Sequence, residues 1–282
     1  MASNPAFNRI EKDAKDGYAG FGGPGASAAQ QAAAGQAATA GMSAQQLQDL
    51  YNQPSAGPVD TRRVTMDDVI MKTLGLFAIV VVFAAGGWAV AANNPTAGSA
   101  IWVGGMIGTL VIGLVIAFRK TLSVPLILVY AVVEGLFMGA VSQYFNEEWP
   151  GIVGQAVLAT LATFAGMFLA YKFGLIKVTA KFRRIMTMMI FGYVIFAIAN
   201  FFFAVFTNST FGFGDAGGLG VAISLFAVGL ASFTLALDFD SIEGAIRTGA
   251  PQKYSWLLAH GLIVTLVWLY IEFLRLFARL RS

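Results

Sequence analysis

Residues 124–145 read VPLILVYAVVEGLFMGAVSQYF, an apolar run that contains a single charged side chain, Glu134. An α-helix rises about 1.5 Å per residue, so a run of this length crosses a hydrocarbon core of about 30 Å. A helix also satisfies its backbone polar groups within the segment, which a bilayer requires. The stretch therefore predicts a transmembrane helix. Because an acid is costly inside a membrane, Glu134 is a candidate functional residue.

Similar apolar runs of 18–23 residues recur along the chain, separated by short connections. The long polar–apolar alternation of a membrane β-barrel is not seen. Thr65 and Asp68 have the spacing of a capping box and predict where the first helix begins. The sequence thus predicts an all-α membrane protein with seven transmembrane helices, at about residues 70–92, 101–118, 124–145, 152–173, 185–206, 217–238 and 255–277.

The composition agrees with this class and excludes several others. Of 282 residues, 57% are hydrophobic and 12% are charged, whereas a soluble domain usually carries about a quarter charged residues. Cysteine is absent and His260 is the only histidine, which excludes thiolate metal sites and histidine relays. The hydrolase motifs Gly-x-Ser-x-Gly and His-Glu-x-x-His and phosphate-binding loops are missing. We therefore expect no enzyme, no cofactor and no nucleic-acid partner.

Residues 1–65 differ from the rest and are rich in Ala, Gly, Gln, Ser and Pro. Such a segment cannot bury enough apolar surface to offset its ordering entropy, so we expect a disordered tail. A short helix at Ser43–Tyr51, transient or docking on a partner, is the one element expected in it. Residues 66–282 then form the membrane domain.

The basic residues predict the orientation of this domain. Twelve Lys and Arg residues lie before the first helix, at its start or near every second connection, and none lies in the alternate connections. This bias places the N-terminus in the cytoplasm of a multi-pass protein of the cell membrane. Seven spans would leave Arg275, Arg279 and Arg281 outside, so a last segment that is tilted or does not fully cross stays open. The twelve are Arg62, Arg63, Lys72, Arg119, Lys120, Lys172, Lys177, Lys181, Arg183, Arg184, Arg247 and Lys253; the alternate connections carry Glu147, Glu148 and Asp215.

Few other ionisable residues lie in or beside the spans, so each is a candidate for ion chemistry. We expect Asp238, Asp240 and Glu243 to close the sixth helix, where they could also be a solvated helix end. Asp240 and Glu243 share a face, and Asp238 points away from Asp240. In the seventh helix, Glu272 could pair with a nearby arginine such as Arg275 or Arg279, and His260 could serve in packing.

The order of several motifs resembles the Bax inhibitor-1/YccA family, in its long-tailed actinobacterial branch. These are Glu-Gly-Leu-Phe-Met-Gly from Glu134, Phe-Asp-Ser-Ile-Glu from Phe239, Tyr-Ser-Trp from Tyr254, and Leu-Tyr-Ile-Glu-Phe-Leu-Arg from Leu269. The resemblance implies six helices packed around a central seventh. It also implies a pH-sensitive calcium leak in which one acid of the sixth helix and one of the seventh share a proton and gate the pore.

Carried over by motif, the gating acids are Asp240 and Glu272, with Glu134 as the acid of the third helix. The same two acids would hold Ca²⁺ transiently, and Asp238, Glu243, His260 and Arg275 are possible neighbours. Asp240 and Glu272 are 32 residues apart, so a direct pair requires the last helix to start late, break or return. Alignment on Tyr254 instead places the second acid near Val264, with His260 as the nearest titratable group.

Three functions fit these observations. The first is a pH-sensitive leak for Ca²⁺ or other cations, gated by intramembrane carboxylates. The second is a non-channel regulator that binds a membrane protease or another membrane partner of a stress response. The third is a secondary transporter, although clear inverted repeats are not seen in the sequence.

Overall fold

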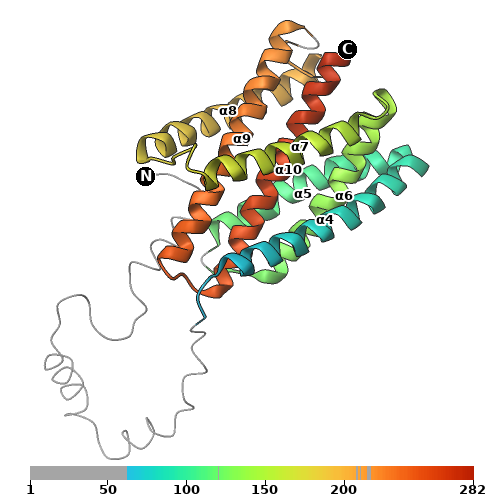
Figure 1. Cartoon of the computed structure of the whole chain (residues 1–282). Coiled ribbons are helices and arrows are strands. Elements are labelled where there is room, and N and C mark those ends of the chain that lie inside the picture. The colour runs from blue at the N-terminus through green and yellow to red at the C-terminus, as the bar shows by residue number, and fades with distance from the viewer. Residues whose placement is uncertain (1–61, 120, 208, 210, 215–216) are drawn as a thin grey trace, which may run out of the picture.

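The computed structural model describes residues 62–282 except 120, 208, 210, 215 and 216 (Figure 1). This part of the chain contains no strands, and all seven of its long helices are apolar enough to cross a membrane. They are α4 (Met66–Asn93), α5 (Pro95–Phe118), α6 (Val124–Glu148), α7 (Ile152–Lys172), α8 (Ala180–Thr207), α9 (Gly218–Arg247) and α10 (Ser255–Arg281), with a 3₁₀ turn (Gln252–Tyr254) before α10. The expected helix at Ser43–Tyr51, the tail up to residue 61, Lys120 and Asp215 lie outside the described residues.

The seven predicted helices are confirmed. The Thr65 side chain accepts a hydrogen bond from the Asp68 backbone nitrogen, and the Asp68 carboxylate accepts one from the Thr65 backbone nitrogen, so the predicted capping box forms. The largest difference is in α9, which continues to Arg247, nine residues beyond the predicted end. Asp238, Asp240 and Glu243 therefore lie within a helix rather than closing it.

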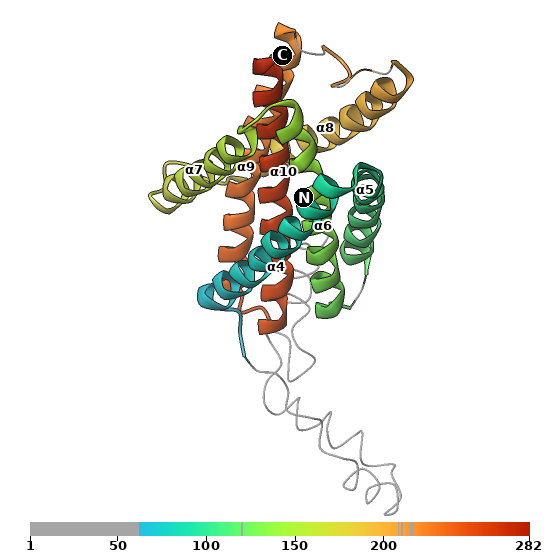
Figure 2. The same cartoon turned by 90° about the vertical axis from the view of Figure 1, so that its right-hand side faces the viewer.

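The last helix, α10, lies in the middle of the bundle (Figure 2). It packs against α4, α6, α7 and α9, whereas α5 packs on α4 and α6, and α8 packs mainly on α9. In Figure 2, α7 and α8 extend away from this centre on opposite sides. We call the end of the bundle where α4 and α10 begin the basic end, because the described basic connections lie there.

Glycines bring α4 and α6 into backbone contact. A Cβ atom on Gly135 of α6 would lie 2.6 Å from the Val80 carbonyl oxygen of α4, and one on Gly139 would lie 2.6 Å from the Trp88 nitrogen and closer still to the Ala84 oxygen. Side chains would prevent this approach, so the helices pack through small residues, as membrane helices commonly do. Glu134 thus lies beside a close-packed face formed by Gly135 and Gly139.

The start of α4 is bonded to the connection between α9 and α10. The Val64 nitrogen donates to the Ala250 oxygen at 2.8 Å, and the Gln252 nitrogen donates to the Arg62 oxygen at 2.8 Å. The Gln252 side chain donates to Asp68 at 2.7 Å, and the Lys72 ammonium donates to the Ser255 hydroxyl. These bonds fix the position from which the central helix begins.

Replacing Gly139 with alanine tests the α4–α6 contact. The added methyl group has no room against the α4 backbone, so overpacking should cost about 1–3 kcal/mol of stability and lower the apparent Tm in detergent. Gly86→Ala in α4 is the matched control, since a Cβ there meets nothing within 4 Å. Equal Tm values for the two variants would show that α4 and α6 do not approach this closely.

Candidate functional site

Glu134 lies in the interior of the bundle and is only 5% exposed. The hydroxyl groups of Tyr130, one turn earlier on α6, and of Thr109 on α5 face its carboxyl group. Neither ion pair among the described residues includes it. Its surroundings are therefore hydroxyl-rich rather than cationic.

Asp238 lies in the interior on α9 and is 6% exposed. The Thr265 hydroxyl of α10 faces its carboxyl group, and its Oδ2 has no hydrogen-bond partner within the described part of the chain. Buried polar atoms nearly always have partners, so one without a protein partner is an available acceptor for a proton or ligand for a cation.

Glu134 and Asp238 lie at similar depths on two sides of α10. Glu134 is ten residues from the start of α6 and Asp238 nine from the end of α9, which places both about 14–15 Å from the basic end. On the α6 side, the Tyr130 ring lies perpendicular to the buried His260 ring of α10, with ring centres 4.5 Å apart. On the α9 side, Thr265 of α10 meets Asp238. The two carboxyl groups thus flank the central helix near the middle of the bundle.

Asp240 points to a different partner from Asp238. It forms an ion pair with Arg183 of α8, and both side chains are partly exposed, at 23% and 34%. Residues two positions apart lie on nearly opposite sides of a helix, which explains why Asp238 faces inward and Asp240 faces α8. Asp240 therefore links α9 to α8.

Glu272 is buried at 2% exposure and also has a partner on α8. The Tyr193 hydroxyl donates to its Oε1 at 2.6 Å, and Trp268 and Arg275 of its own helix donate at 3.0 and 3.4 Å. The Tyr193 and Trp268 rings also lie against each other, with centres 5.6 Å apart. The expected pairing with Arg275 is present, and it belongs to a larger cluster that joins α8 to α10.

The described contacts do not bring Asp240 and Glu272 together. Asp240 lies seven residues before the end of α9 and Glu272 17 residues after the start of α10, or about 10 and 26 Å from the same end of the bundle. The seventh helix starts at Ser255 and runs without a break, so none of the three distortions that a direct pair required is present. The direct pair expected from the motifs is therefore not formed here.

Arg279 and Arg281 did not fit the predicted distribution of basic residues between the two sides of the membrane. Both form hydrogen bonds at the end of the bundle opposite the basic end. Arg279 is buried and donates to the Gly220 and Phe211 carbonyls and, at 2.9 Å, to the Ser224 hydroxyl. Arg281 donates to the Pro150 carbonyl at 2.9 Å and to the Gln155 side chain at 2.8 Å. These hydrogen bonds hold the end of α10 in place. The helix itself is long enough to span a membrane.

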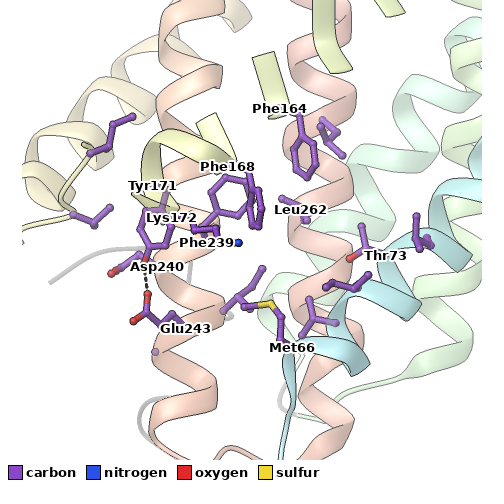
Figure 3. Close-up of a pocket in the computed structure, with 18 of the residues that line it drawn as sticks. Met66, Thr73, Phe164, Phe168, Tyr171, Lys172, Phe239, Asp240, Glu243 and Leu262 are labelled. Carbon is purple, nitrogen blue, oxygen red and sulfur yellow. Dashed lines mark hydrogen bonds between the residues drawn. The ribbon is translucent and has the colours of Figure 1, made fainter. Parts of the chain in front are cut away.

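A groove of about 990 Å³ opens between α4, α7 and α9 at the basic end (Figure 3). Asp240 and Glu243 lie on its α9 wall, where the Tyr171 hydroxyl of α7 donates to Glu243 at 2.6 Å. Apart from this hydrogen bond and the charged groups at its mouth, the lining is mainly apolar. The groove is therefore distinct from the buried hydroxyl-rich surroundings of Glu134 and Asp238.

The sequence identified the acidic residues but not the side chains that contact their carboxyl groups. Tyr193, Thr109 and Thr265 lie within apolar runs, where a hydroxyl gives no signal until the neighbouring helix is known. Arg183 was counted only as a loop charge. In the described ranges, no group of three or more histidine, cysteine or acidic side chains could hold a metal ion.

The sequence model of the Bax inhibitor 1 like family matches residues 4–282. The chain belongs to this family. No curated protein matches it. Membership of the Bax inhibitor 1 like family and the seven apolar helices together describe a multi-pass membrane protein in contact with the lipid bilayer.

Tyr193→Phe tests whether Glu272 holds α8 in place. Loss of the hydroxyl removes a hydrogen bond to a buried carboxylate, which should cost about 0.5–1.5 kcal/mol and lower the apparent Tm in detergent. Tyr144→Phe is the control, because Tyr144 is a more exposed tyrosine of α6 whose ring packs edge to face against Trp102. A Tm unchanged by Tyr193→Phe would mean that the contact does not stabilise the bundle.

Proposed function

We propose that this protein is a pH-sensitive leak for Ca²⁺ or other cations, controlled by protonation of Glu134 and Asp238. The observation that carries the proposal is the placement of these two buried carboxyl groups on either side of the central helix, one with an oxygen that lacks a partner among the described residues. Hard carboxylate oxygens are the ligands that Ca²⁺ prefers. The family resemblance supports the same activity.

Protonation changes what these groups can do. A protonated carboxyl group is neutral and can donate a hydrogen bond, which holds neighbouring helices together. A deprotonated one carries a charge that is unfavourable without a partner and is relieved by a cation or by water entering the bundle. Raising the pH therefore favours the form that accepts cations, so the leak should increase with pH.

The motif-derived acids give a competing proposal for the same activity. If Asp240 and Glu272 gate the leak, their contacts with Arg183 and Tyr193 would have to break when the pore opens. Helix α8 would then move. In the proposal favoured here, these two acids anchor α8 and the ions pass elsewhere. Replacing each acid separately distinguishes the two.

The orientation and the location belong to the same proposal. With the basic end in the cytoplasm, the N-terminus is cytoplasmic and Glu147 and Glu148 face the other side of the cell membrane. Arg279 and Arg281 do not oppose this orientation strongly, because Arg279 donates hydrogen bonds to the Ser224 hydroxyl and the Phe211 carbonyl within the protein.

The test is Ca²⁺ flux into proteoliposomes between about pH 6 and pH 8. Wild type should show flux that rises with pH, and Asp238→Asn and Glu134→Gln should each flatten that rise, because neither replacement can be deprotonated. Glu148→Gln is the control, since Glu148 is an exposed acid at the opposite end.

Four results would count against the proposal. Flux that is flat with pH in wild type removes pH control, and a normal pH response in both Asp238→Asn and Glu134→Gln removes these residues. A response lost only in Asp240→Asn and Glu272→Gln assigns the gate to the motif-derived acids. Absence of any flux favours the second of the three functions that fit the sequence, a regulator that binds a membrane partner.

A further inference from the structure

The groove between α4, α7 and α9 is charged at its mouth and apolar within. Lys172 and Lys177, on the α7 side, and Arg247, at the end of α9, lie at the mouth, and all three are exposed. Phe164 and Leu161 lie deeper on α7. Figure 3 shows α7 and α9 side chains on one side of this space and Met66 and Thr73 of α4 on the other.

The depth of the groove corresponds to one leaflet of a bilayer. Leu161 lies 11 residues before Lys172, the end of α7, and Phe77 lies 11 residues after Met66, the start of α4. Measured along its own helix, each is therefore about 16 Å from the basic end, about half of a hydrocarbon core of about 30 Å. A partner helix would contact the protein across the whole membrane, whereas this surface ends near its middle.

The charges at the mouth favour an anionic occupant. Two acids also lie there, but Asp240 is paired with Arg183 and Glu243 accepts a hydrogen bond from Tyr171. The three basic side chains are not members of the ion pairs found among the described residues. Basic pockets between membrane helices at the headgroup level bind anionic lipid headgroups.

The inner wall is suited to an acyl chain. The Phe239 ring packs against those of Phe164, Phe168 and Tyr171, with ring centres 5.5–5.8 Å apart, and this aromatic wall faces the groove. Leu262 and Leu266 of α10 are also part of the lining. Aromatic and aliphatic side chains without free polar groups give a hydrocarbon chain a surface that differs from fluid lipid mainly in being fixed.

We propose that this groove is a binding site for one anionic phospholipid of the leaflet at the basic end. Its acyl chain lies between α4 and α7, and Lys172, Lys177 and Arg247 bind its phosphate. The site lies outside the Glu134 and Asp238 region, so it does not depend on the proposed cation leak.

Native mass spectrometry of the detergent-solubilised full chain tests the proposal. The probes are phosphatidylglycerol and phosphatidylcholine with the same acyl chains. Wild type should retain one phosphatidylglycerol in preference to phosphatidylcholine. The triple variant K172Q/K177Q/R247Q should lower the retained phosphatidylglycerol by about a hundredfold, because each of the three basic groups contributes to the attraction.

The matched control is R119Q/R184Q/K253Q, which removes three exposed charges from the same end but outside the groove. A second pair of variants tests the apolar part. Leu161→Trp fills the groove and should reduce binding, whereas Leu158→Trp, on an exposed position of the same helix, should not. Helix content by circular dichroism and elution on gel filtration establish that each variant is folded.

The outcomes separate the lipid from other occupants. Equal retention of the two lipids by wild type overturns the anionic site, as does equal loss in the two triple variants. Unchanged binding in Leu161→Trp places the lipid elsewhere on the surface. A dimer in wild type that Leu161→Trp dissociates shows that a second copy of the chain covers the groove instead.

Discussion

The backbone contact between α4 and α6 is the constraint on which the site depends. Gly135 and Gly139 must face α4, because a side chain at either position would meet its backbone. Glu134 precedes Gly135 by one residue, so its side chain is turned about 100° away, toward Thr109 of α5. The glycines that allow close packing therefore also direct the only acid in the middle of α6 into the interior of the bundle.

Helix α8 is held in a different way. Met186 is its only buried residue among those described, and partly buried side chains such as Phe182 and Ile190 pack beside it against α9. Two polar contacts also join α8 to its neighbours, namely Arg183 with Asp240 of α9 and Tyr193 with Glu272 of α10. These contacts are ten residues apart on α8, about 15 Å, which matches the difference in depth between the two acids. Asp240 and Glu272 thus share a structural role along one helix without touching each other.

Hydropathy predicted the number of helices because apolar length alone decides which segments can cross a bilayer. The capping box and the glycine face were also predictable, since each depends on residues close in sequence. The direction in which each acidic side chain points could not be predicted. Asp238 and Asp240 are two positions apart in one apolar helix, and only the positions of α8 and α10 determine which of them faces inward. For the same reason, the tyrosines and threonines around the carboxyl groups gave no signal.

Four acids of the described bundle fall into two chemical groups. Asp240 and Glu272 each form an ion pair with an arginine, which is a partner for a carboxylate. Glu134 and Asp238 have hydroxyl neighbours, which interact with a protonated or a charged carboxyl group alike. A group whose partners favour one state is suited to fixing a helix, whereas a group whose partners accept both is suited to responding to protons. Under the proposed function, Asp240 and Glu272 are anchors of α8, and Glu134 and Asp238 are the groups that respond to protons.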